Sequence, residues 1–238
     1  ISNLWVAGSS SDDCHPIGTA IGVQHGLEQE KNQSFTYVNM ESLYLGPDAF
    51  KSLAFALEKA EEKELDVIHN PDEARIAQLI ADGNVFGRCI GRMEFGQRAL
   101  GNRSIIADPR DSEVVGRINR MIKQRDFWMP FAPVILDSSA DELIVGNSGV
   151  DGRHMTIVFE TTEKGRKVLR GACHPADGTV RAQILERQDN PGFYDLIAAF
   201  EKITGVGALL NTSFNTHGEP IVNTSDEALS VFLGSEID

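Results

Sequence analysis

The side chains best suited to chemistry in this sequence are the cations between Arg88 and Arg125. This stretch carries a formal charge of +5, whereas the rest of the 238-residue chain carries −18. Clustered cations repel one another unless an anion, or acids from elsewhere in the fold, neutralise them, and the planar fork of arginine matches phosphate and carboxylate. We therefore interpret the stretch as an anion-binding site for phosphate. The alternative, a solvated helix face with structural ion pairs, would account for about half of the nine cations, which are Arg88, Arg92, Arg98, Arg103, Arg110, Arg117, Arg120, Lys123 and Arg125.

The stretch opens with a glycine-rich string, Gly91-Arg-Met-Glu-Phe-Gly-Gln-Arg-Ala-Leu-Gly-Asn-Arg-Ser104. Its three glycines let the backbone approach a ligand closely, with arginines between them. No Gly-Lys-Ser/Thr follows, so the string is not a Walker loop. Arg98, which lies between two of the glycines, is the leading phosphate ligand, and the alternative is an ion pair with Glu94 one turn away.

Polar side chains further along the chain also follow strand-like segments. Asn211 and Ser213 come directly after Ala208-Leu-Leu210, where α/β sheets commonly bind ligands. Arg181 ends the segment Asp177-Gly-Thr-Val-Arg181 and supplies a further cation. Each has a simpler alternative: Asn211 and Ser213 as turn formers, and Arg181 as an ion-pair partner of Asp177.

Composition limits the class of protein. With 41% apolar residues, the chain can bury a real core as one large domain or one and a half. No run approaches the roughly 20 apolar residues of a membrane span, and the first residues given do not have the pattern expected of a secretory leader. The cysteines at positions 14, 89 and 173 follow no metal or redox spacing, so we expect a cytoplasmic protein. Because the chain opens at Ile1 on an apolar run, we expect it to begin inside a longer protein.

Hydrophobic periodicity predicts interleaved helices and strands, which favours an α/β or α+β fold with a mixed sheet. Asn70-Pro71 predicts a helix start, and Gly83 its end. Ser225 is the expected cap of the last helix. The predicted helices cover residues 49–64, 71–82, 111–124, 193–204 and 225–233, and the predicted strands cover residues 4–7, 85–90, 132–136, 154–160, 179–185 and 207–210.

Five motifs in order carry a family resemblance. Besides the glycine-rich string they are Ile118-Asn-Arg-Met-Ile-Lys123, Pro130-Phe-Ala-Pro133, Asp177-Gly-Thr-Val-Arg181 and Leu210-Asn-Thr-Ser-Phe-Asn215 followed by Gly218-Glu-Pro220. Together they resemble the C-terminal half of the NodU/CmcH-type carbamoyltransferases, from about residue 65 to the end. The resemblance implies a YrdC-like domain over residues 65–238, a mixed twisted sheet with flanking helices. Residues 1–28 would be the tail of an actin-like (ASKHA-type) domain, and residues 29–64 a linker with a charged helix.

The resemblance also implies a reaction. The YrdC-like domain would combine ATP, with Mg²⁺, and carbamoyl phosphate into carbamoyl-adenylate, releasing pyrophosphate and phosphate. The actin-like domain of the same full-length chain would then transfer the carbamoyl group to an acceptor hydroxyl that the sequence does not identify.

Positions within the motifs assign roles to particular residues. Arg98, Lys123 and Arg181 would be the catalytic phosphate clamps, although Lys123 has the alternative of an ordinary exposed helix lysine. Asp12 would ligate a divalent metal together with histidines of the N-terminal region, with a solvated turn aspartate as the alternative. The implied substrate and nucleotide ligands are Arg92, Arg103, Asn211, Ser213 and Asn215, of which Arg92 and Arg103 have the alternative role of bracing the loop.

One departure from the family pattern and two rival functions stay open. Many family members carry arginine directly before Pro-Phe-Ala-Pro, where this chain has Met129 after Trp128. Either Arg125 replaces the missing cation, or the nucleotide lies against a more apolar wall.

Two rival functions are an RNA-binding module and a catalytically silent nucleotide-binding domain. The RNA-binding module is disfavoured because the charge of −18 on the remaining chain repels a polyanion. The roles of His174 and His217 are left open.

Overall fold

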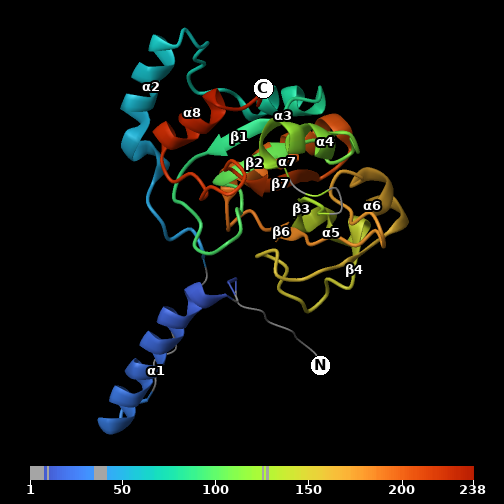
Figure 1. Cartoon of the computed structure of the whole chain (residues 1–238). Helices are drawn as coiled ribbons and strands as arrows, with labels where there is room; N and C mark the ends of the chain where they lie inside the picture. Colours follow the sequence, from blue (N-terminus) through green and yellow to red (C-terminus); the bar gives the residue numbers. More distant parts are fainter. Residues whose placement is uncertain (1–7, 10, 35–41, 125, 127–128) are drawn as a thin grey trace.

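A five-stranded mixed sheet forms the centre of the molecule in the computed structural model, which describes residues 8–9, 11–34, 42–124, 126 and 129–238 (Figure 1). The strand order is β1-β2-β7-β3-β6, in which β3 and β6 are parallel and the other neighbours antiparallel. The strands are β1 (Phe86–Cys89), β2 (Arg103–Ala107), β7 (Ala208–Ser213), β3 (Ala132–Leu136) and β6 (Gln183–Leu185). A separate pair joins β4 (Ile144–Val145) to β5 (Glu160–Thr161).

Helices cover both faces of the sheet because β2 alternates its side chains between two apolar clusters. Ile106 belongs to the cluster with Ile80 of α3 (Glu73–Ala81) and Phe200 of α7 (Pro191–Thr204). Ile105 points to the opposite face, in the cluster with Ile118 of α4 (Val114–Ile118). That second cluster also includes residues of the π-helical turn η3 (Asn119–Lys123) and of α8 (Ser225–Leu233).

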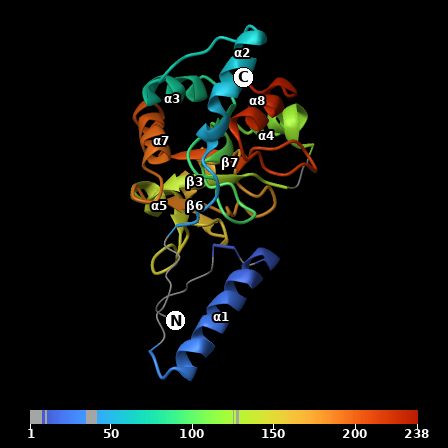
Figure 2. The ribbon, with the colours of Figure 1, turned by 90° about the vertical axis from the view of Figure 1, so that its left-hand side faces the viewer.

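The remaining helices lie around this core. They are η1 (Asp12–Cys14), α1 (His15–Glu30), η2 (Ala49–Ser52), α2 (Leu53–Glu62), α5 (Asp137–Leu143) and α6 (Glu163–Val168). α1 projects away from the sheet in both views (Figures 1 and 2), and Glu28 is its one buried residue. α2 lies beside α8, where Lys59 Nζ donates a 2.7 Å hydrogen bond to Ser230 Oγ. Within the described ranges, no helix has the length and apolar character needed to cross a bilayer.

Most of the predicted elements are confirmed, and the mixed α/β class with them. The strand predicted over residues 154–160 is confirmed only at its end: Met155 adopts a positive φ of 56°, Phe159 forms one isolated antiparallel bridge with Val180, and Glu160 belongs to β5. The strand predicted over residues 179–185 shortens to β6, and the one over residues 4–7 lies outside the described residues. Two caps were misplaced, because Asp72 rather than Asn70 caps α3, and Thr224 rather than Ser225 forms a capping box with Glu227.

The register of the strands brings the sequence motifs to one end of the sheet. Ser104 pairs with Ser213, Ala132 with Asn211, and Val134 with Gln183. The starts of β2, β3 and β6 therefore lie at the same end of the sheet as the finish of β7. The segments that enter or leave the sheet there are residues 91–102, 129–131, 177–182 and 214–220, which carry the glycine-rich string and three further motifs.

Candidate functional site

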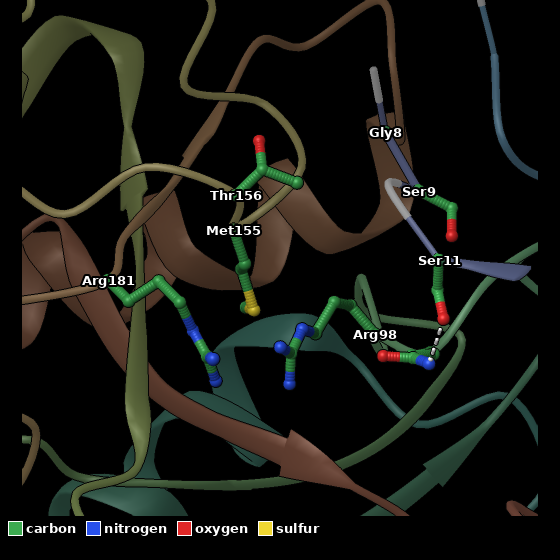
Figure 3. Close-up of a pocket in the computed structure, with 8 residues that line it drawn as sticks. Gly8, Ser9, Ser11, Arg98, Met155, Thr156 and Arg181 are labelled. Atoms are coloured by element: carbon green, nitrogen blue, oxygen red, sulfur yellow. Dashed lines mark hydrogen bonds between the residues drawn. The ribbon is translucent and has the colours of Figure 1, made fainter. Parts of the chain in front are cut away.

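Arg98 and Arg181 line two neighbouring cavities at this end of the sheet. The first measures about 430 Å³ and the second about 540 Å³. Both guanidinium groups point into the same space, one from the glycine-rich string and one from the segment before β6 (Figure 3). Besides the two arginines, the first cavity is lined by Gly8, Ser9, Ser11, Gln97, Met155 and Thr156, and the second by Met129, Pro130, Phe131, Val158, His174 and Thr179.

The Glu94 carboxylate binds backbone N–H groups and does not form the alternative ion pair with Arg98. Glu94 is 6% exposed, and its Oε1 accepts hydrogen bonds from the backbone N–H groups of Leu100, Asn102 and Arg103 at 2.7, 2.8 and 3.2 Å. Asp177, the alternative partner of Arg181, accepts from the N–H and Oγ1 of Thr179. Both arginine side chains line the cavities, where an anion would meet both.

The second cavity has one cationic side and one apolar side. Met129, Pro130, Phe131 and Val158 form the apolar part of its wall. Met129 thus lies in the cavity wall itself, at the position where the resemblance predicts arginine. Arg125 and Trp128, invoked in the sequence analysis, lie outside the described residues.

Lys123, Ser213 and Asn215 form a second cluster, between the end of η3 and the end of β7. Lys123 is 2% exposed, and its Nζ donates hydrogen bonds to Asn215 Oδ1 at 2.6 Å and to Ser213 Oγ at 3.1 Å. Ser213 Oγ in turn donates to Asn215 Oδ1 at 2.7 Å. The alternative of an exposed helix lysine is therefore wrong. Ser213 and Asn215 thus hold the ammonium group of Lys123 at the end of β7 through side-chain oxygens.

Arg103 and Arg92 hold backbone carbonyls. Arg103 is fully buried at the start of β2, and its guanidinium donates five hydrogen bonds of 2.9–3.2 Å, to the carbonyl oxygens of Pro47, Ile90, Gly91, Asn102 and Asn223. Arg92 donates to the carbonyls of Leu45 and Gly46. Through these contacts Arg92 and Arg103 brace the loop, which was the alternative role for both residues. The role of Arg92 and Arg103 as nucleotide ligands stays a prediction.

Asn211 connects the central strand to the loop that carries Arg98. Its Nδ2 donates a 3.0 Å hydrogen bond to the carbonyl of Ala99, and the side chain is 1% exposed. Within the described part of the chain, Asn211 Oδ1 is buried without a hydrogen-bond partner. Asn211 therefore holds the residue that follows Arg98, and its role as a substrate ligand stays a prediction.

The remaining candidates lie apart or contribute to a wall. Asp12 is fully exposed, with Oδ1 3.9 Å from His15 Nδ1. The described residues contain no group of three or more His, Cys, Asp or Glu side chains able to hold a metal ion, so Asp12 as a metal ligand stays a prediction. His174 lines the second cavity, and its Nδ1 accepts a 3.3 Å hydrogen bond from the Ala176 N–H. His217 is exposed in a turn whose N–H reaches the Ile122 carbonyl.

Burial shapes the ionisation of residues beneath the site. Arg88 lies 5.4 Å from the Phe193 ring centroid and donates to the Gly101 carbonyl, and burial lowers its pKa to about 10. Burial likewise raises the pKa of the Cys89 thiol to about 11. Both residues belong to β1, at the edge of the sheet, and neither lines the two cavities.

Sequence reasoning missed the roles of Glu94, Met155 and Thr156. Glu94 was considered only as a partner of Arg98, although one acid inside a basic string was itself a signal. Met155 and Thr156 lay in a segment predicted as a strand, and the left-handed backbone at Met155 instead accompanies a turn beside the first cavity.

Comparison with known proteins points in one direction. Residues 77–238 match the family described as Carbamoyltransferase C-terminus. The chain is 39% identical over 233 residues to the nodulation protein NolNO of Sinorhizobium fredii, covering 94% of this chain and 33% of that protein. It is 28% identical over 222 residues to the 3'-hydroxymethylcephem-O-carbamoyltransferase of Amycolatopsis lactamdurans, covering 93% of this chain and 39% of that one.

Coverage of the longer proteins is partial. The chain spans 41% of the nodulation protein NolO of Bradyrhizobium diazoefficiens, at 39% identity over 227 residues. Among solved structures, full-length HypF in its phosphate- and nucleotide-bound form aligns with 69% of this chain and 24% of its own, with a TM-score of 0.49 and 18% identity.

Proposed function

Because this chain belongs to the carbamoyltransferase C-terminal family, we propose that it holds the site at which an O-carbamoyltransferase makes carbamoyl-adenylate from ATP and carbamoyl phosphate. The observation that carries the proposal is the pair of cavities that share Arg98 and Arg181. Two adjoining spaces with the same two cations suit two polyanionic substrates that must react with each other. The acceptor hydroxyl and the second transfer step belong to the longer protein.

The proposed reaction needs both substrates held together. Water cleaves carbamoyl phosphate to carbamate and inorganic phosphate. A carbamate oxygen then attacks the α-phosphorus of ATP, forming a new O–P bond while the bond to the β-phosphate oxygen breaks and pyrophosphate leaves. Negative charge accumulates on the phosphate oxygens at each step, and fixed guanidinium groups stabilise it most where water is excluded.

Roles for the residues follow from where they lie. Arg98 and Arg181 would clamp phosphate oxygens at the junction of the two cavities. Lys123, held by Ser213 and Asn215, would bring a further positive charge from the end of β7. The apolar side of the second cavity, which includes Met129, would take the adenine ring, because a flat apolar ring is best removed from water there.

Mg²⁺ would accompany the ATP phosphates in this proposal. The described residues offer no acidic cluster to hold the ion, so its ligands would be phosphate oxygens and water, and we assign no step to a metal site of this chain. The same reasoning leaves Asp12 to the transfer reaction of the longer protein.

The test is the product itself. The intact protein, supplied with ATP and carbamoyl phosphate, is expected to form carbamoyl-AMP detectable by mass spectrometry. Arg98→Ala should reduce its formation at least about 100-fold, since charged ligands of transferring phosphates contribute on this scale. The matched control is Arg187→Ala, which removes an exposed arginine paired with Asp195 and should leave the rate unchanged. No carbamoyl-AMP from the wild-type protein would refute the proposal.

A second candidate rests on Met129. An apolar residue in the cavity wall, where the family pattern predicts arginine, fits a domain that binds nucleotide without turnover. Normal ATP affinity with no carbamoyl-AMP in the intact protein would favour this candidate. Restoration of turnover by Met129→Arg would establish that the missing cation is the reason.

A further inference from the structure

The loop that carries Arg98 is closed by one buried carboxylate. Glu94 lies four residues before Arg98, and its Oε1 accepts three backbone hydrogen bonds from residues beyond Arg98, at Leu100, Asn102 and Arg103. The segment 95–99, with Arg98 in it, is therefore bounded by Glu94 on one side and by the residues that Glu94 holds on the other. Hydrogen bonds that a carboxylate accepts from N–H groups are stronger than those between neutral groups.

Neighbouring contacts hold the outer parts of the same loop. The Arg103 guanidinium binds the carbonyls of Ile90 and Gly91, which precede Glu94. Asn102 Nδ2 donates 2.8 Å to the Arg92 carbonyl, and Gly101 N–H donates 3.0 Å to Ser104 Oγ. Glu94 is the acidic member of this arrangement, and it satisfies three N–H groups that would otherwise be buried without partners.

Space around the loop leaves little freedom. A Cβ at Gly101 would lie 2.3 Å from the Phe193 ring, and the backbone there has φ +116°. Gly101, which lies between two of the residues that Glu94 holds, therefore packs directly against Phe193 of α7. Ala99, the residue after Arg98, is also held, because its carbonyl accepts a hydrogen bond from Asn211. The backbone on the C-terminal side of Arg98 is therefore fixed.

We propose that Glu94 is a positioning residue for Arg98: its carboxylate fixes the glycine-rich loop so that the Arg98 guanidinium faces the shared cavities. The inference rests on the proposed anion-binding function of those cavities. Positioning and simple electrostatics predict opposite effects of removing the Glu94 side chain on anion affinity. Removing a negative charge near a phosphate site should strengthen anion binding, whereas loss of positioning should weaken it.

Two variants separate these effects. Glu94→Gln removes the charge but keeps an oxygen that accepts the three N–H bonds, so its affinity for anions should equal or exceed that of the wild type. Glu94→Ala removes both the charge and the accepting oxygen. The affinity of this variant for anions should fall about tenfold, because the buried hydrogen bonds that order Arg98 are lost. The measurement is isothermal titration of inorganic pyrophosphate into the intact protein. Equal affinity of the two variants would overturn the proposal.

A thermodynamic cycle tests whether Glu94 acts through Arg98. In the Arg98→Ala background, Glu94→Ala should cost less than about twofold, because the group that it positions is gone. A full tenfold loss in that background would assign Glu94 a general structural role and refute positioning. Amide hydrogen exchange gives a ligand-free readout: Leu100 and Asn102 should exchange faster in Glu94→Ala than in Glu94→Gln.

A stability control completes the design. Leu143→Ala removes a buried side chain of α5, after the opposite end of β3, and should lower the melting temperature without changing pyrophosphate affinity. If Leu143→Ala weakens binding as much as Glu94→Ala does, the effect is loss of stability and the proposal fails. If the wild type binds neither pyrophosphate nor ATP, the proposed function fails with it; if Arg98→Ala weakens binding and Glu94→Ala does not, the positioning inference alone fails.

Discussion

Arginines of the same glycine-rich string have opposite surroundings. Arg103, and Arg92 beside it, donate to backbone carbonyls and hold the loop. Arg98, with Arg181 from a distant segment, lines cavities. Residue type and spacing therefore indicate that cations are needed here, and the surrounding carbonyls decide which of them are structural. Substitutions in the two groups should therefore have different effects on stability and on anion binding.

The largest effect is expected at Arg103. Arg103→Ala would leave carbonyls buried without partners and remove a fully buried side chain, so the free energy of unfolding should fall by about 3–5 kcal/mol. Denaturant titration measures it. The matched variant Arg117→Ala removes a half-exposed arginine bonded to the Gly83 carbonyl and Asp238, and should cost about 1 kcal/mol or less. Equal losses for the two variants would contradict a special structural role for Arg103.

Arg98 should show the reverse pattern. Arg98→Ala is expected to weaken pyrophosphate and ATP binding by about 1.5–3 kcal/mol, the contribution of a charged hydrogen-bond partner, and to change unfolding free energy by less than about 0.5 kcal/mol. Titration calorimetry and denaturant unfolding on the same samples provide both numbers. A large stability loss with unchanged affinity would place Arg98 in the structural group.

The sequence predicted this site in part. The motif pattern assigned Arg98, Lys123 and Arg181 as phosphate clamps, and of these Arg98 and Arg181 line shared cavities, whereas Lys123 lies in a separate cluster. It did not separate Arg98 from Arg103, which depends on carbonyls brought in from Pro47 and Asn223, far apart in the chain. Helix and strand positions followed hydrophobic periodicity, and the main failure, at residues 154–160, came from the left-handed backbone at Met155, to which periodicity is blind.

A smaller effect is expected at Met129, which lies on the apolar side of the second cavity. Met129→Arg should tighten pyrophosphate binding by about 0.5–1 kcal/mol, because a partly exposed added charge is screened by solvent. Met129→Leu is the matched control and should leave affinity unchanged. The gain should shrink as salt rises from 50 to about 500 mM; a tightening that does not depend on salt would contradict an electrostatic cause.

The stability of the protein at alkaline pH should depend on Cys89 in β1. Burial raises the pKa of this thiol from 9.0 to about 11, so the folded state retains the proton where the unfolded state has lost it. Its contribution to stability is complete below pH 9 and is lost as pH rises through 11. Cys89→Ala should therefore show a shallower decline in unfolding free energy between pH 9 and 10.5 than the wild type. Identical slopes would contradict the assignment.

The central claim, that Arg98 and Arg181 serve one shared pair of anionic substrates, is tested most directly by a structure of the intact protein with a non-hydrolysable ATP analogue and inorganic phosphate. The account predicts phosphate oxygens within about 2.7–3.2 Å of both guanidinium groups, at the junction of the two cavities. Anions bound elsewhere, with the Arg98 and Arg181 side chains left in solvent, would contradict it.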